Sequence, residues 1–201
     1  KFKNNEREVI GNFIAILNLI SEGSQKDNFI TNGTWSKYYS LLPKVIDLLP
    51  CWTVTSLSAR KKVPFNAGLF DLVIIDESSQ CDIASILPLL FRAKRAVILG
   101  DEKQFSHISS ITKSQDQILI QKYDLLDHSR WSYSSSSLFS LASSLCQNEN
   151  LIVLKEHHRS HSDIINYSNK YFYNNVLRVA TKYSNLKFPL EGTIIKWIDI
   201  K

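Results

Sequence analysis

The stretch Phe70-Asp-Leu-Val-Ile-Ile-Asp-Glu-Ser-Ser-Gln80 decides how this sequence is interpreted. Its run from Phe70 to Ile75 is rich in apolar and β-branched residues and does not alternate, which is typical of a strand buried in a parallel sheet. Asp76 and Glu77 follow this run directly. Ligands of open α/β sheets bind beyond the carboxyl ends of the strands. The stretch therefore predicts a buried strand that delivers two carboxylates to a ligand-binding edge.

A second strand of the same kind follows along the chain. Arg95 to Leu99 is apolar and ends in Gly100-Asp-Glu-Lys-Gln104, where the glycine permits a tight turn. Between the two strands, Ile83 to Arg92 has a helical period apart from Pro88. Strand, helix and strand in this order form a βαβ unit, which builds a parallel sheet. We therefore expect Asp76 and Asp101 at the same edge of one sheet.

The remaining elements are predicted from hydrophobic periodicity and from turn residues. Gly23 is expected to cap the first helix, and a mobile polar connection with some helix is expected between Ile111 and Ser137. A second α/β domain is expected to begin near Asn148. Helices are predicted at Glu6 to Ser21, Thr34 to Leu49, Leu138 to Cys146 and Ser162 to Tyr173, and further strands at Trp52 to Leu57, Leu151 to Leu154 and Thr193 to Ile200.

The composition is that of an ordinary soluble domain, with 44% hydrophobic and 21% charged residues and a net charge of +5. The excess of positive charge permits a polyanionic partner. No apolar run approaches the roughly 20 residues of a membrane span, and no signal peptide opens the chain. The cysteines Cys51, Cys81 and Cys146 are predicted to be reduced core residues, which favours the cytoplasm. Because the chain begins at Lys1 and contains no Met, we expect a fragment of a longer protein.

Adjacent carboxylates at a strand end suit a nucleotide site. Asp76 can hold a Mg²⁺ ion on the nucleotide, and Glu77 can polarise the attacking water. The alternative is that both residues only cap the next helix. The second loop, with Asp101 and Gln104, adds further acid and amide groups at the same edge and favours the nucleotide site.

These motifs resemble those of superfamily 1 helicases. Asp-Glu-x-x-Gln at Asp76 to Gln80, followed by Gly-Asp-x-x-Gln at Gly100 to Gln104, resembles motifs II and III of that family. Trp52-Thr-Val-Thr-Ser-Leu-Ser58 resembles the preceding motif that contacts the nucleic-acid backbone, and Leu154-Lys-Glu-His-His-Arg-Ser160 resembles motif IV. The phrase from Gly68 to Asp82 is most similar to bacterial AAA-type members of the Upf-type, 5′-to-3′ branch. The resemblance extends over residues 50–109 and 150–173.

The resemblance implies an incomplete RecA-like P-loop NTPase fold, with a parallel sheet flanked by helices. Residues 1–147 would form the later part of the first motor domain, with 110–137 as a polar connection, and residues 148–201 the beginning of the second. The longer protein would couple ATP hydrolysis to translocation on DNA or RNA and to its unwinding. It would be a cytoplasmic, monomeric motor that binds single-stranded DNA or RNA and no membrane.

The resemblance also implies roles for individual residues. Asp76 would coordinate Mg²⁺, Glu77 would orient the hydrolytic water, Gln104 would sense the γ-phosphate, and Arg159 would act as an arginine finger. His158 stands where relatives place a tyrosine that stacks on the base. Thr55 and Ser56 would contact the backbone of the single strand. The residues expected to bind the nucleotide are Asp76, Gln80, Asp101 and His158.

One expected feature is absent from these 201 residues. A phosphate-binding loop needs Gly-x-x-x-x-Gly-Lys-Ser/Thr, and no two of the six glycines are five positions apart. The chain by itself is therefore expected to bind ATP weakly and to be inactive in hydrolysis. An alternative is a non-catalytic helicase-like module that binds nucleic acid or protein. A different P-loop ATPase is disfavoured by the Gly100 to Gln104 motif.

Other histidine, tryptophan and basic residues give weaker evidence of function. His157 and His161 are not expected on one helix face, so a metal site there is disfavoured. Trp52 is expected to pack in the core rather than to stack on bases. The basic residues that flank the motifs form either a phosphate-tracking patch or solvated strand ends, and they are Lys61, Lys62, Arg92, Lys94 and Arg95.

Overall fold

The computed structural model describes residues 2–25, 30–185, 195 and 198–199. The chain divides into two compact units, residues 1–74 with 84–97 and residues 75–83 with 98–201. The chain contains both helices and short parallel strands, which is consistent with the predicted α/β class. The boundary near Asn148 stays a prediction.

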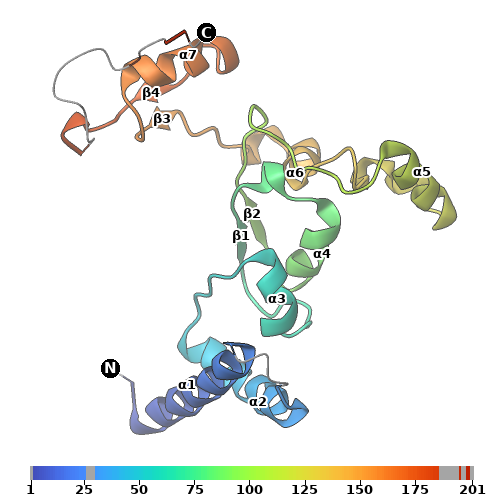
Figure 1. Ribbon diagram of the computed structural model, residues 1–201, viewed down its shortest axis with the longest axis vertical. Coiled ribbons are helices and arrows are strands. Elements are labelled where there is room, and N and C mark those ends of the chain that lie inside the picture. Colours follow the sequence, from blue (N-terminus) through green and yellow to red (C-terminus); the bar gives the residue numbers. More distant parts are fainter. Residues whose placement is uncertain (1, 26–29, 186–194, 196–197, 200–201) are drawn as a thin grey trace. The chain divides into compact units, whose positions relative to one another are not determined.

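The first unit contains two helices that pack against each other, coloured blue in Figure 1, α1 (Asn4–Gln25) and α2 (Asn32–Leu48). Both predicted helices are confirmed, but α1 continues through Gly23, so this glycine is not its cap. The Thr31 hydroxyl accepts the Thr34 N–H and caps α2. The rings of Phe13 and Tyr38 stack with their centroids 5.3 Å apart. The core of the pair consists of Phe13, Ile16, Tyr38, Leu42 and Val45, with Trp52 packed against it as predicted.

The predicted strand Trp52 to Leu57 is wrong, because its second half begins a helix. The Thr55 side chain accepts the Ser58 N–H at 3.2 Å and starts α3 (Ser56–Lys62). Such capping satisfies an amide that the helix itself cannot pair. The Leu57 side chain is 73% exposed, so no neighbouring strand buries it. The β-branched residues before Thr55 do not overcome this local start signal.

The two central strands are confirmed, although both are shorter than predicted. They are β1 (Val73–Ile75) and β2 (Ala96–Ile98), and they form one sheet. The Val73 N–H donates to the Arg95 carbonyl, and the Leu99 N–H donates to that of Ile75. The partners advance in the same direction, so the strands are parallel. The connection between them contains α4 (Ile83–Phe91), which confirms the predicted βαβ unit.

Arg92 follows α4 and is a buried structural residue. Its guanidinium donates to the carbonyls of Val63, Pro64 and Pro88, and it lies 4.8 Å from the Phe65 ring centroid. Burial lowers the pKa of this arginine. Arg92 is therefore excluded from the suggested phosphate-tracking patch. Lys94 pairs with Asp71 at 2.7 Å on the surface.

In the second unit, the polar connection between Ile111 and Ser137 is largely helical. It contains α5 (Lys113–Lys122) and the 3₁₀ segment η2 (Leu126–Trp131), and α6 (Leu138–Leu145) follows as predicted. Asp116 on α5 is buried, and its Oδ2 accepts the Ser132 hydroxyl at 2.5 Å and both the N–H and hydroxyl of Ser134. The serine-rich stretch is therefore ordered around one carboxylate.

A second parallel pair lies further along this unit, drawn in orange in Figure 1. The strands β3 (Glu156–His157) and β4 (Arg178–Val179) pair in parallel, and α7 (Ser162–Phe172) connects them. The strand predicted at Leu151 to Leu154 is wrong, since these side chains are 49–82% exposed and pairing starts only at Glu156. Most of the strand predicted at Thr193 to Ile200 lies outside the described residues. Two further 3₁₀ segments are η3 (Asn148–Asn150) and η4 (Tyr183–Asn185).

All three cysteines have free thiols. Cys81 is half-buried, but Cys51 and Cys146 are exposed, so the prediction that they are core residues is wrong. Neither belongs to a cluster of buried apolar side chains that would shield the thiol. Among the described residues, no helix has the length and apolar character to cross a membrane.

Asp116 generates a stability prediction. Burial acts to raise the pKa of this carboxyl, but hydrogen bonds from Ser132 and Ser134 hold it below the ordinary value. Its stabilising effect is therefore present above about pH 4, the usual aspartate pKa, and is lost as the pH falls further. Asp116→Ala should reduce the free energy of unfolding at pH 7 by about 2 kcal/mol. Urea unfolding at pH 7 and pH 3 measures this, with the exposed Asp127→Ala as control. Equal losses for both variants would contradict the assignment.

Candidate functional site

The loops that follow β1 and β2 lie together at one edge of the sheet. Leu99 donates its N–H to the Ile75 carbonyl at 2.8 Å, and Ser78 donates its N–H to the Leu99 carbonyl at 2.9 Å. Asp76 and Asp101 therefore both follow the carboxyl ends of adjacent parallel strands. The predicted common edge is confirmed for these two strands.

Two buried serines join the two loops. The Ser78 hydroxyl donates to the Leu99 carbonyl at 2.6 Å. The Ser79 hydroxyl donates to the Asp101 carbonyl at 2.8 Å and accepts the Asp101 N–H at 2.7 Å. Ser79 therefore satisfies both backbone groups of the residue that carries the second carboxylate. These serines were not among the residues predicted for the site; their signal in the sequence is two small hydroxyl residues directly after the carboxylate pair.

Glu77 has a left-handed backbone, with φ 52° and ψ 37°. Among the described residues, the other non-glycine residues with positive φ are Asp124, Asn174 and Asn175, types that tolerate this conformation. The short side chains of Asn and Asp can form local hydrogen bonds that offset the strain of this conformation. A glutamate does not have this advantage, and the conformation costs it about 1–2 kcal/mol. It persists because the following segment η1 (Ser78–Gln80) is anchored by the two buried serines. Strained residues of this kind concentrate at functional sites.

Gly100 is needed for close packing rather than for a special turn. A Cβ atom at this position would lie 2.5 Å from Cδ2 of Phe139 and 2.7 Å from the Ser78 hydroxyl oxygen. Phe139 belongs to α6, whose first residue, Leu138, donates its N–H to the Cys81 carbonyl at 2.9 Å. From the sequence, this glycine was predicted to permit a tight turn. The structure instead shows α6 packed directly on its backbone.

The Asp101 carboxylate organises the second loop. Its Oδ1 accepts the Lys103 N–H at 2.9 Å, and its Oδ2 accepts the Gln104 side-chain amide at 3.3 Å. The Tyr173 hydroxyl also donates to Oδ2, at 2.5 Å. Asp101 thus holds the Gln104 side chain at the sheet edge. Tyr173 has no counterpart in the predicted site, because it lies 72 residues away in the sequence.

The other predicted nucleotide contacts are exposed. Gln80 ends η1, and the side chains of His158 and Arg159 follow β3. His158 Nε2 lies 3.3 Å from a Glu156 carboxylate oxygen. Among the described residues, Arg159 forms no hydrogen bond or ion pair with Asp76 or Glu77, so its role as an arginine finger stays a prediction. His157 bonds the Ser160 hydroxyl at 2.7 Å, and the described residues contain no cluster of three potential metal ligands.

Thr55 and Ser56 belong to the first unit, at the start of α3. The Thr55 hydroxyl donates to the Ser58 hydroxyl at 3.0 Å while it caps the helix. The Thr55 hydroxyl thus already bonds to two groups of Ser58, although the residue is exposed. Contact of these residues with a nucleic-acid backbone stays a prediction.

The donor set at the edge fits a hard cation. Asp76 is exposed, and its Oδ1 accepts the N–H of Glu77 at 2.9 Å. Mg²⁺ prefers carboxylate and water oxygens together with substrate phosphates. An exposed Asp76 beside Glu77, with Asp101 and Gln104 at the same edge, can therefore hold such an ion and place a second carboxylate beside it.

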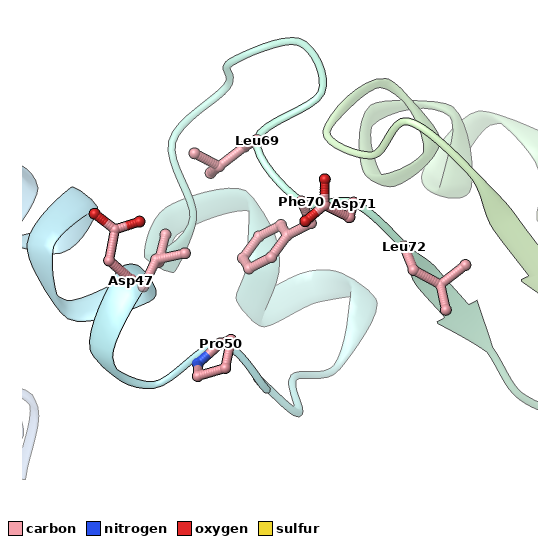
Figure 2. Close-up of a pocket in the computed structure, with 7 residues that line it drawn as sticks. Asp47, Pro50, Leu69, Phe70, Asp71 and Leu72 are labelled. Atoms are coloured by element: carbon pink, nitrogen blue, oxygen red, sulfur yellow. The ribbon is translucent and has the colours of Figure 1, made fainter.

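The first unit also contains an open pocket, but it is not the candidate site. Figure 2 shows it between the end of α2 and the chain before β1. None of the predicted site residues lines it, and one of its carboxylates, Asp71, pairs with Lys94. The lining residues are Ile46, Asp47, Pro50, Leu69, Phe70, Asp71 and Leu72.

The parallel strands and the acidic loops that follow them are consistent with an α/β protein whose carboxylates lie at one sheet edge. Comparison with known families agrees, since residues 45–108 match the AAA domain family. This range contains both strands and both acidic loops. The match covers less than half of the chain.

Relatives refine this class. The chain is 33% identical over 160 residues to a protein named an uncharacterized ATP-dependent helicase from Mycoplasma genitalium, and 31% identical over 160 residues to its homolog from Mycoplasma pneumoniae. Each alignment covers 78% of this chain but 14% of the relative. The chain thus spans about one seventh of the length of these relatives. Together with the domain match, these relatives support the resemblance to a helicase family.

The packing at Gly100 generates the second prediction. Gly100→Ala should reduce the free energy of unfolding by about 1–3 kcal/mol, because the new methyl group overlaps the Phe139 ring and the Ser78 hydroxyl. Thermal unfolding of the variant measures this loss. Adding Phe139→Leu should recover part of it, since a smaller side chain leaves room. If the double variant loses as much free energy of unfolding as the two single variants lose in sum, the proposed overlap is contradicted.

Proposed function

We propose that this chain is part of an ATP-dependent superfamily 1 helicase of the Upf-type, 5′-to-3′ branch. The observation that supports it best is the pair of acidic loops at one sheet edge, joined by Ser78 and Ser79, with Glu77 of the first loop in a left-handed conformation. Such strain is consistent with a carboxylate that must face one direction. The helicase names of the two relatives agree with this reading.

In the proposed reaction, the side chains of this edge divide the work of phosphoryl transfer. Asp76 would hold Mg²⁺, which when bound would neutralise charge on the phosphates. Glu77 accepts a proton from the attacking water and orients it, Gln104 contacts the γ-phosphate, and Arg159 stabilises the charge that develops on it. Gln80, Asp101 and His158 complete the nucleotide contacts.

The proposal extends to the fold and the partners of the longer protein. We infer RecA-like motor domains, with a first domain that ends near residue 147 and a second that begins near residue 148. Thr55 and Ser56 would contact a single strand of DNA or RNA, so that hydrolysis drives translocation and unwinding. The motor would act as a monomer in the cytoplasm.

A second candidate is a helicase-like binding module without motor activity. These 201 residues contain no Gly-x-x-x-x-Gly-Lys-Ser/Thr, so the two candidates differ in whether the longer protein carries this loop. Without that loop the phosphates lack their main cradle of backbone amides. The following experiments distinguish the two candidates.

Glu77→Gln in the longer protein tests the catalytic role. The amide keeps the size of the side chain but cannot accept the proton, so ATP turnover should fall at least about 10²-fold. Binding of ATP should remain. Steady-state hydrolysis and a nucleotide-binding titration measure the two effects.

The matched control for this variant is Glu102→Gln, an exposed glutamate in the second loop. It should retain turnover within about twofold, because its carboxylate has no assigned role. Equal turnover in Glu77→Gln and the wild type would remove Glu77 from the mechanism. Absence of ATPase activity in the wild type would favour the binding module.

The 201-residue chain itself should show no stabilisation by Mg-ATP. Without the phosphate-binding loop, Asp76 supplies a single protein ligand to Mg²⁺, and this ion gives up its bound water reluctantly. A ligand at about 100 times its Kd would add about 2.7 kcal/mol of stability and a clear rise in Tm. A thermal melt with and without Mg-ATP measures this. A rise of several degrees that Asp76→Ala abolishes would contradict the expectation.

A further inference from the structure

The hydrogen bond from Tyr173 to Asp101 connects two distant parts of the second unit. The phenol donates to Oδ2 of Asp101 at 2.5 Å, although 72 residues separate them. Lys103 and Gln104, the other donors to this carboxylate, belong to the same short loop. Donors within the loop move together with it and cannot anchor it. Tyr173 holds the carboxylate from outside the loop.

Tyr173 is itself held firmly by the turn that ends α7. Its N–H donates to the Asn169 carbonyl at 3.2 Å, and the N–H of Asn175 donates to the same carbonyl at 2.9 Å. The buried Asn169 side chain donates to the Leu177 carbonyl and accepts the Leu177 N–H. Because both backbone groups of Leu177 are paired to one side chain, the turn has a defined shape. The phenol therefore projects from a fixed point.

The same group of elements carries Arg159. The segment before it, β3, pairs with β4 directly after the Asn169 turn. The Thr181 hydroxyl donates to the carbonyls of His157 and Ser160, at 3.2 and 2.8 Å, on either side of Arg159. Hydrogen bonds thus run continuously from the Arg159 segment through β4 and the Asn169 turn to Tyr173.

We propose that Tyr173 is a positioning residue: through Asp101 it orients Gln104, and it ties the Gly100–Gln104 loop to the elements that carry Arg159. This inference rests on the proposed ATP hydrolysis, in which Gln104 and Arg159 both face the γ-phosphate. Gln104 and Tyr173 share one acceptor, Oδ2 of Asp101, so the phenol defines where the amide of Gln104 is held. Tyr173 itself touches no reacting atom.

The electrostatics suit a permanent donor. Burial and the neighbouring Asp101 carboxylate raise the pKa of Tyr173 to about 12. The phenol therefore stays protonated at neutral pH and can only donate to this carboxylate. A hydrogen bond to an ionised acceptor is roughly twice as strong as one between neutral groups.

The test compares Tyr173→Phe with Tyr171→Phe in the full-length protein. Both variants remove one hydroxyl, but Tyr171 is 61% exposed and its ring contacts Tyr167 on the surface of α7. We expect Tyr173→Phe to lower kcat for ATP about tenfold with KM changed less than twofold, which is a loss of transition-state positioning. Tyr171→Phe should change neither constant.

A second measurement follows the loop directly. Hydrogen exchange of a peptide that contains residues 100–105 should become faster in Tyr173→Phe and not in Tyr171→Phe, because the amides of Lys103 and Gln104 both depend on Asp101. Melting temperatures of both variants are recorded alongside. Asp101→Asn combined with Tyr173→Phe should lose little more than Asp101→Asn alone, since the two groups act as one pair.

The outcomes separate this inference from the proposed function. A wild type without ATPase activity overturns the proposed function, and the catalytic role of Tyr173 with it. An active wild type, with kcat and loop exchange unchanged in Tyr173→Phe, overturns the inference and leaves the proposed function standing. A lower Tm with unchanged kcat and exchange also overturns it, because it shows a merely structural hydroxyl.

Discussion

The reciprocal hydrogen bonds between the Ser79 hydroxyl and the backbone of Asp101 hold the acidic edge together. A short parallel pair of strands leaves its two loops free to diverge once the ladder ends. Ser78 and Ser79 prevent this by extending the pairing past the strands with side-chain groups. Because both serines are buried, water cannot replace these bonds without opening the packing around them. The positions of the carboxylates depend on this arrangement.

The strain at Glu77 and the contact at Gly100 follow from the same constraint. Once Ser78 is fixed to Leu99, the chain must turn within one residue after Asp76, and Glu77 takes the left-handed conformation. On the other loop, α6 approaches so closely that Phe139 leaves no room for a Cβ at Gly100. The helix in turn holds the end of η1 through Cys81. One sheet edge is thus packed against α6, while the Asp76 and Glu77 side chains stay exposed.

Two strand predictions were wrong, either because a helix cap competes with strand propensity or because no neighbouring strand is there to pair. Trp52 to Leu57 has strand propensity, but Thr55 caps a helix, and no strand lies beside Leu57 to bury it. Leu151 to Leu154 is apolar without pairing, because pairing with β4 begins at Glu156. Arg92 belongs to a basic series in the sequence, yet three carbonyl groups surround it in the fold. A charged residue near a motif is therefore not by itself a ligand contact.

The sequence alone determined the long helices, the two central strands, their parallel order and the acidic loops that follow them. These features depend on periodicity and on residues close together in the chain, so local sequence patterns are sufficient to predict them. The tertiary structure decided which groups hold that edge: Ser78 and Ser79 across 21 and 22 residues, and Tyr173 across 72. Serine and tyrosine carry no periodic signal, and their hydrogen bonds exist only once distant backbone segments meet. The partners of Asp101 could therefore be identified only in the folded chain.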